Sequence, residues 1–501
     1  MKLIFYICIF SFLISNIFTE DKLRWTFELI NHGARAPNSG LNTDLKDFMN
    51  HQWIGQSELT GVGLRQSFLV GYRDRLRYIE EKKLISEEYD PRDIFVYASE
   101  NNRTLMSASA LLHGLFLPGT GPQIDPDLVK RAVPPVDEET FIKEKEELDN
   151  DNCTALPGRM NLVPVHISFS HEYFTQYENS KKCVGLKSYE DKNRNRKDVT
   201  EFLDKMTEKY AKNLTKIFTD KDINLLKDYD FAYYFFDTIV CLYFDGADEF
   251  NEIVNILNVN EEELLKDSYE FLRLNTVGNG IENDKDFINY LVSPVFHKIL
   301  HYIEYRIEKD TKGDMNYKGY DLPKYFILSG VANSCGAFMS FMNKYFGTEI
   351  KYANFSTNLH LELYLENPEK EEITENDYRI EYYYNDEFLL SISYVEFKNK
   401  IKNYLLNQND INSFCIAEDK KEDEKDEKDE KEEKEDDSNW YMIGIIIAVI
   451  VIIILVVIII IVLRKRIKSN NIIENDGKEK LMKDADRSTV ETKELNNENS
   501  E

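Results

Sequence analysis

The stretch that decides the fold reads RWTFELINHGARAP and covers residues 24–37. Its first half alternates between apolar and other residues, with Trp25, Phe27 and Leu29 on one face, which is typical of a β-strand. A loop containing glycine and proline follows. Residues from about 59 to 83 then repeat apolar side chains with the period of an amphipathic helix. The sequence therefore predicts a strand, a loop and a long helix in succession.

The predicted helix carries one apolar stripe, which we interpret as the face that packs on the core of the protein. The stripe consists of Leu64, Phe68, Leu69, Tyr72, Leu76 and Ile79. Two further strand–turn–helix units follow along the chain. Residues 94–98 are a short, wholly apolar run, as expected of a buried parallel strand, and a helix is expected over about 103–116. Residues 325–328 repeat the scheme, with a turn at 329–330 and a helix near 336–345.

Later strands are expected at residues 359–365, 378–384 and 389–395. The three strand–turn–helix units indicate an α/β fold in which an open mixed sheet is flanked by helices. In such folds the functional site lies beyond the carboxyl ends of the strands. Residues 137–321 are richer in helical patterns and are interpreted as an inserted, mainly helical domain. The α/β core then combines residues 20–136 with residues 322–417.

The two ends of the chain predict a single-pass membrane protein of type I. Residues 3–15 are apolar and follow Lys2, which is the pattern of a secretory signal peptide ending near residue 19. Tyr441–Leu463 has no charged residue, and 23 residues are enough to span ~30 Å of hydrocarbon as a helix. Basic residues follow, which places the tail, 464–501, in the cytosol. The ectodomain is then expected in the lumen of the secretory or lysosomal pathway, or at the cell surface.

The charge of the chain limits its partners. Acidic residues outnumber basic residues 90 to 62, and the formal net charge is −28, so binding to nucleic acid is not expected. Residues 418–440 begin with a long run of acidic residues and lysines that cannot form a core. This composition favours a solvated stalk in front of the membrane segment. A helical spacer and a calcium-binding run are the alternatives for this stretch.

Cysteines and sequons agree with an oxidising, secretory compartment. The chain has six cysteines, and Cys8 is removed with the signal peptide, so disulfide bonds and at least one leftover thiol are expected. Sequons for N-glycosylation occur at Asn102, Asn152, Asn213 and Asn354. The chain is therefore expected to be a glycoprotein with disulfide bonds.

Residues that can carry chemistry gather where the first two predicted strands end. His32 and Arg35 follow the first strand, and Arg103 follows the second. Two guanidiniums next to one imidazole form a pocket for an anion, because arginine donors match phosphate oxygens in geometry. An imidazole that is neutral at its attacking nitrogen is also a competent nucleophile toward phosphorus. Each residue alone is more often structural or solvated, and only their conjunction indicates a site for a phosphate monoester or another small anion.

Several segments resemble, in the same order, those of the histidine acid phosphatase family. INHGARAP around His32 resembles the family signature RHGxRxP, and ELTGVG at 58–63 resembles the segment LTxxG. The segment from Val96 to Ala108 resembles the second phosphate-binding segment, and LELY at 361–364 also falls in family order. The resemblance covers residues 24–415, which is nearly the whole ectodomain.

The resemblance implies a membrane-anchored phosphomonoesterase that works in two steps without a metal or cofactor. By resemblance, His32 attacks phosphorus to form a phosphohistidine, which water then hydrolyses. Arg35 and Arg103 would hold the phosphoryl oxygens, where charge stabilisation is the main catalytic effect. The resemblance also implies a disulfide between Cys183 and Cys415. In the family, the leaving alcohol takes its proton from an aspartate in a His-Asp pair after a late strand.

The sequence departs from the family pattern at three positions, and all three affect the chemistry. Asn31 replaces the arginine before the nucleophile, and Val331-Ala332 stands where the His-Asp pair is expected. Glu100, in the turn after the second strand, is the candidate substitute acid. Two hypotheses follow: a phosphatase of reduced activity that still uses His32, or a catalytically inactive relative that binds phosphorylated or other anionic ligands.

Overall fold

The computed structural model of the chain describes residues 21–38, 51–132, 134, 153–167, 191–218, 224–277, 285–313, 322–349, 351–407 and 409–411. All of them belong to one compact unit, residues 1–417. Within these ranges, no helix is both long enough and apolar enough to cross a bilayer. The predicted signal peptide, acidic stalk, membrane segment Tyr441–Leu463 and tail lie outside the described residues, as do Cys183 and Cys415.

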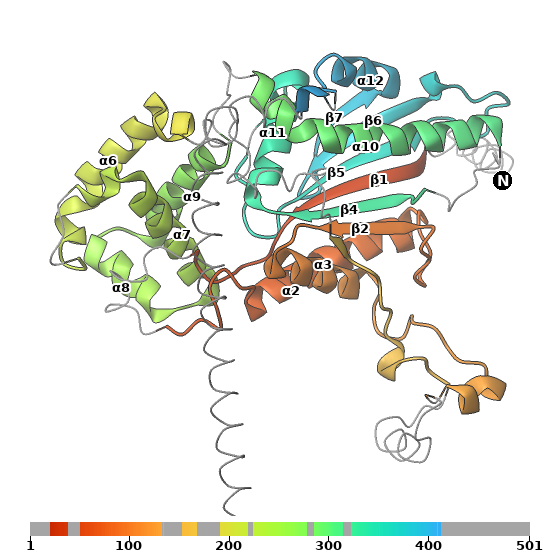
Figure 1. Cartoon of the computed structure of the whole chain (residues 1–501), viewed down its shortest axis with the longest axis horizontal. Coiled ribbons are helices and arrows are strands. Elements are labelled where there is room, and N and C mark those ends of the chain that lie inside the picture. The colour runs from red at the N-terminus through yellow and green to blue at the C-terminus, as the bar shows by residue number, and fades with distance from the viewer. Residues whose placement is uncertain are drawn as a thin grey trace, which may run out of the picture. The chain divides into compact units, whose positions relative to one another are not determined.

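The described residues form a mixed sheet of seven strands (Figure 1). The strands are β1 (Lys22–Asn31), β2 (Ile94–Ala98), β3 (His166–Ile167), β4 (Tyr325–Gly330), β5 (Asn358–Leu365), β6 (Tyr378–Tyr384) and β7 (Glu387–Ser393). They lie in the order β3-β2-β4-β1-β5-β6-β7. The pairs from β3 to β1 are parallel, and the pairs from β1 to β7 are antiparallel. The predicted α/β fold with a mixed sheet is therefore confirmed.

Helices cover both faces of the sheet (Figure 1). One face is covered by α2 (Gly61–Asp74), its π-helical continuation η1 (Arg75–Glu81) and α3 (Asn102–Leu115). The other face is covered by α10 (Lys285–Lys312), α11 (Ala332–Phe346) and α12 (Tyr394–Lys402). Neighbouring residues of β1 serve the two cores in turn, since Leu29 packs on the α10 side and Ile30 on the α2 side. Short 3-10 turns are η2 (Pro126–Arg131), η3 (Pro157–Arg159), η6 (Leu225–Lys227) and η7 (Glu375–Asp377).

The inserted helices are α6 (Lys197–Leu214), α7 (Tyr229–Asp245), α8 (Asp248–Leu257) and α9 (Glu261–Val277). They share a core of their own, with Phe235, Phe236 and Phe271 near its centre. We expected the insertion to continue to residue 321, but α10 buries Phe296 and Ile303 in the core of the sheet. The insertion therefore ends before α10. The sequence could not show this boundary, because a helical pattern does not tell which of two cores a helix covers.

The apolar stripe predicted for α2 does not face the core, which corrects the sequence interpretation. Most of its members are exposed, namely Leu64, Leu69, Tyr72 and Leu76. The buried face of α2 consists instead of small residues such as Gly63, Ser67 and Gly71. A Cβ on Gly71 would lie 1.8 Å from the carbonyl oxygen of Leu111 in α3. Because the two helices approach so closely, only small side chains fit between them, and the larger ones lie on the outer face.

Candidate active site

The carboxyl ends of β1, β4 and β2 meet at one edge of the sheet, because these neighbouring strands are parallel. Asn31, the last residue of β1, pairs with Gly330, the last residue of β4. His32 directly follows β1, and Arg103 lies in the first turn of the helix after β2. The fold therefore brings together residues that are far apart in the chain, at the edge where α/β folds have their sites.

His32 is 4% exposed, and its Nδ1 lies 2.9 Å from the carbonyl oxygen of Gly33. A carbonyl can only accept a hydrogen bond, so the proton is on Nδ1 and the lone pair is on Nε2. Burial lowers the pKa of His32 well below its ordinary value, and the positive charges of Arg103 and Arg35 lower it further. Protonation of the imidazole is therefore disfavoured, and the lone pair of Nε2 is not taken up by the contact with Gly33.

The loop after β1 is held against the start of α2. A Cβ at Gly33 would lie 2.2 Å from the carbonyl oxygen of Gly63, so the contact requires glycine. The Ala34 amide donates to the side chain of Gln66 at 2.9 Å, and the hydroxyl of Thr60 donates to the carbonyl of Ala34 at 3.2 Å. The segments around His32 and Thr60, which are separate in the sequence, therefore form one rigid contact.

Arg103 is half-buried in the first turn of α3. The turn before it is fixed by Thr104, whose hydroxyl donates to the carbonyl of Ser99 at 2.8 Å. The Ser329 hydroxyl donates to the Thr104 carbonyl at 2.8 Å, which ties this turn to the end of β4. Arg103 acts electrostatically on the imidazole of His32, as the sequence predicted for the two residues.

Arg35 has a partner that the sequence did not predict. Its guanidinium forms a two-point ion pair with Asp237 of α7, with Nη2 2.7 Å from Oδ1 and Nη1 3.1 Å from Oδ2. Both side chains are less than one-tenth exposed, at 8% and 6%. The backbone amide of Asn38 also donates to Asp237 Oδ2, at 3.1 Å. The carboxylate of Asp237 therefore occupies the two guanidinium nitrogens that could otherwise bind two phosphate oxygens. This ion pair lies where the inserted helices meet the sheet.

Asn31 has a structural role at the end of β1. Its side-chain amide donates to the carbonyls of Ala353 and Asn354, at 3.1 and 2.8 Å. The loop that it holds carries Phe355, whose ring centroid lies 5.8 Å from that of His32 and 5.8 Å from the guanidinium carbon of Arg35. Phe355 is thus a site residue that the sequence interpretation missed, although it is the middle residue of the sequon at Asn354.

Among the described residues, no replacement for the missing acid stands out. Val331 and Ala332 are half-buried at the start of α11, and neither can donate a proton. Glu100 is exposed to solvent, and no described contact holds its carboxyl group beside His32. Asp237 is the acidic residue that the sequence interpretation missed, and its signal is a lone charge within the apolar run FAYYFFDTIVC, residues 231–241.

The mixed α/β sheet presents a buried histidine and two arginines at the carboxyl ends of its parallel strands. The chain matches the sequence model of the histidine phosphatase superfamily (branch 2) over residues 10–347. The chain therefore belongs to this superfamily.

Proteins similar to this chain in sequence include acid phosphatases, and each alignment is short. The chain is 38% identical over 115 residues to the lysosomal acid phosphatase of Xenopus laevis, which is 23% of this chain and 25% of that protein. It is 31% identical over 127 residues to the human lysosomal acid phosphatase, which is 24% of this chain and 29% of that protein. The alignments thus span about a quarter of the length of these relatives. Among solved structures, a phytase of Klebsiella sp. ASR1 has a TM-score of 0.47 at 12% identity, over 77% of this chain and 97% of that chain.

Proposed function

We propose that this protein is a membrane-anchored phosphatase that hydrolyses phosphate monoesters slowly, through a phosphohistidine at His32. One observation carries the proposal: Nδ1 of the buried His32 faces the Gly33 carbonyl oxygen at 2.9 Å, which leaves the Nε2 lone pair available beside two guanidiniums that lower the pKa of the imidazole. The names of the relatives, which are acid phosphatases, support a phosphate monoester as the substrate class.

In the proposed reaction, Nε2 of His32 attacks phosphorus and the bond from phosphorus to the ester oxygen breaks. Arg103 stabilises the negative charge on the phosphoryl oxygens, and water then attacks the phosphohistidine to release phosphate. The leaving alkoxide takes its proton from solvent, because neither Val331 nor Ala332 can supply one. Losing a general acid removes ~10²–10⁴ in rate, which makes esters with good leaving groups the best substrates.

The low pKa of His32 suits an acidic compartment. The imidazole stays neutral below its ordinary pKa, because burial and the two arginines disfavour its protonation. Phosphatase activity should therefore persist as the pH falls below neutrality. This supports the proposed location of the ectodomain in the secretory or lysosomal lumen, with a signal peptide at the start and Tyr441–Leu463 as the membrane anchor. N-glycans and a Cys183–Cys415 disulfide are part of the same proposal.

The second candidate function is binding of a phosphorylated or other anionic ligand without turnover. The replacement of the His-Asp pair by Val331-Ala332 favours it, because turnover needs a proton donor that binding does not need. A phosphatase assay on the purified chain from acidic to neutral pH, beside His32→Ala, separates the two functions. Activity that His32→Ala abolishes supports the enzyme, and equal background in both supports the binder.

Replacing Arg103 with alanine should weaken binding of phosphate or vanadate by ~1.5–3 kcal/mol, because charged hydrogen bonds are lost. Isothermal titration calorimetry measures this difference directly. Arg92→Ala is the matched control, because Arg92 is exposed and pairs locally with Asp90. An unchanged affinity in Arg103→Ala would show that the anion does not bind at this edge of the sheet.

A further inference from the structure

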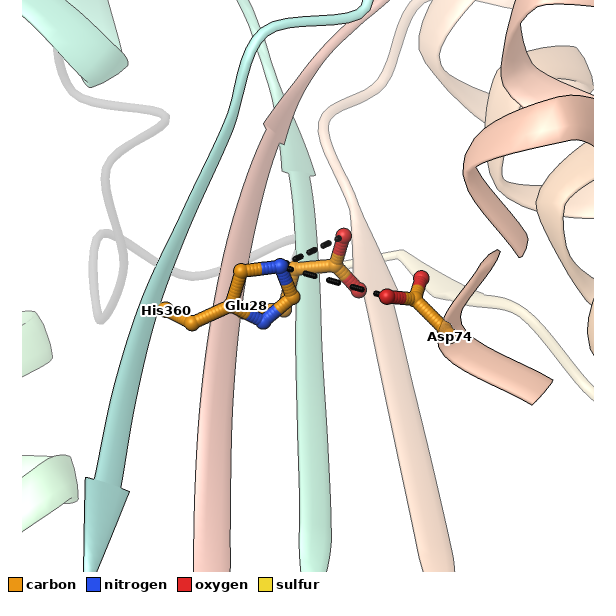
Figure 2. Close-up of side chains that lie close together, drawn as sticks. All are labelled: Glu28, Asp74 and His360. Atoms are coloured by element: carbon orange, nitrogen blue, oxygen red, sulfur yellow. Dashed lines mark ion pairs between the residues drawn. The ribbon is translucent and has the colours of Figure 1, made fainter. Parts of the chain in front are cut away.

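A second group of chemically active side chains lies between the sheet and α2. Figure 2 shows Glu28 of β1, His360 of β5 and Asp74 of α2 pointing toward one another. Their exposed fractions are 0%, 1% and 1%. Nε2 of His360 lies 3.9 Å from Glu28 Oε1 and 3.9 Å from Asp74 Oδ1. One atom of each residue lies within 4.8 Å of the other two, so the three could hold a single ion.

The two carboxylates of this cluster are not balanced by the arginines beside them. Arg77 forms a two-point pair with Glu362, at 2.7 Å for both contacts, and Arg73 pairs with Asp386 at 2.5 Å. Asp74 Oδ2 is buried and has no hydrogen-bond partner among the described residues. Burying two carboxylates without a counter-charge costs several kcal/mol per ion, ~3–5 when a buried pair loses one partner. Burial raises the pKa of Glu28 to about 7 and raises the pKa of Asp74 as well, so either a bound cation or protons must balance the two carboxyl groups.

The remaining contacts orient His360 and Glu28 within the cluster. The hydroxyl of Tyr78 bonds His360 Nδ1 at 2.8 Å, and the hydroxyl of Tyr325 donates to Glu28 Oε2 at 2.6 Å. Groups that hold a ligand from its far side in this way are typical of metal sites. On the near side, the Asn358 amide nitrogen lies 2.8 Å from His360 Nε2 and 3.4 Å from Glu28 Oε1. An electropositive group thus already stands where these two acceptors converge.

We propose that Glu28, Asp74 and His360 form a structural site for one divalent metal ion, with Zn²⁺ as the best fit. One imidazole and two carboxylates suit zinc, whereas magnesium and calcium prefer oxygen ligands throughout. The charge of the ion balances both carboxylates. Ligand atoms of a tetrahedral zinc site lie ~3.4 Å apart, so the 3.9 Å separations need to close by about half an ångström. The amide of Asn358 would turn away from the ion.

The role of this ion is to join α2 to β1 and β5. Its bonds would cross the layer between α2 and the sheet, where Figure 2 shows the three side chains. Glu28 lies inside β1, whereas His32 follows the end of that strand. No step of the proposed phosphatase reaction runs through it. Metal binding and phosphatase activity can therefore be tested independently of each other.

The test is the metal content of the purified full chain, measured by plasma mass spectrometry after incubation with Zn²⁺ and removal of unbound ion. We expect about one equivalent of zinc in the native chain, and less than about 0.2 in Asp74→Asn, which removes the charge and keeps the shape. His113→Gln, which changes an exposed histidine on α3, should keep the full equivalent. A chelator should lower the melting temperature of the native chain by at least about 5 °C and leave that of Asp74→Asn unchanged.

Two results of the zinc measurements would overturn the metal site. One is a well-folded native chain without bound zinc, whose melting temperature rises as the pH falls, because protons then balance the carboxylates. The other is an equal zinc content in Asp74→Asn and the native chain. If Asp74→Asn does not fold, Co²⁺ titration of the native chain decides the question. A visible absorption band that saturates at one equivalent and is displaced by Zn²⁺ supports the site, and no band overturns it.

Discussion

The triple variant Asn31→Arg, Val331→His, Ala332→Asp should hydrolyse nitrophenyl phosphate at least ~10²-fold faster than the parent chain, which is the low end expected of one general acid. Residues 331 and 332 follow β4, which pairs with the strand that ends just before His32. Both are half-buried, so longer side chains can reach the site. Val331 is the N-cap of α11 and makes no side-chain cap bond, so its replacement removes no contact that the helix needs.

Asn31→Arg carries the main structural cost of the triple variant, because Asn31 donates to the carbonyls of Ala353 and Asn354. The double variant without this change is therefore measured beside the triple one. In both variants, adding His32→Ala should remove the gain, since the reaction needs the phosphohistidine. A well-folded triple variant that is no faster than the parent would contradict a purely chemical loss of activity.

Asp237→Asn should destabilise the chain by ~3–5 kcal/mol, because it leaves the buried guanidinium of Arg35 without its counter-charge. Vanadate or phosphate should restore part of this stability and should bind at least about tenfold more tightly than to the parent chain. The reason is that the freed guanidinium can form charged hydrogen bonds with the anion. Urea unfolding with and without vanadate measures both effects.

Asp230→Asn is the matched control for this experiment. Asp230 lies on the same helix and pairs with Arg194, but both side chains are exposed, at 56% and 40%. Exposed pairs contribute ~0–1 kcal/mol, so the control should change neither stability nor vanadate affinity by much. A destabilised Asp237→Asn without tighter vanadate binding would mean that Arg35 serves the fold alone and does not reach the anion.

Much of the fold could be predicted from local patterns. The strand at residues 94–98 and that at 378–384 have the predicted bounds, because short apolar runs, continuous or alternating, are typical of strands. The approach of His32 and Arg103 could be predicted as well. Parallel neighbouring strands have their carboxyl ends at the same edge, so residues that follow such strands must be near one another.

The rest of the fold and of the site depends on contacts between residues that are far apart in the sequence. The outward position of Leu69 and Leu76 follows from the glycine contact between α2 and α3, and the apolar period of one helix cannot reveal it. The ion pair of Arg35 joins residues about 200 positions apart, so only the packing of the insertion on the sheet brings it about. The cluster around Glu28 likewise combines three segments that no spacing rule connects.

The most direct test of the central claim is detection of phosphate on His32. The purified chain is mixed with a radiolabelled phosphomonoester of a good leaving group, quenched in alkali, where phosphohistidine survives, and mapped by peptide mass spectrometry. We predict acid-labile label on the peptide that contains His32, and none in His32→Ala. An unlabelled His32 in a folded chain that still binds vanadate would contradict the claim, and the protein would then be a binder of phosphorylated ligands.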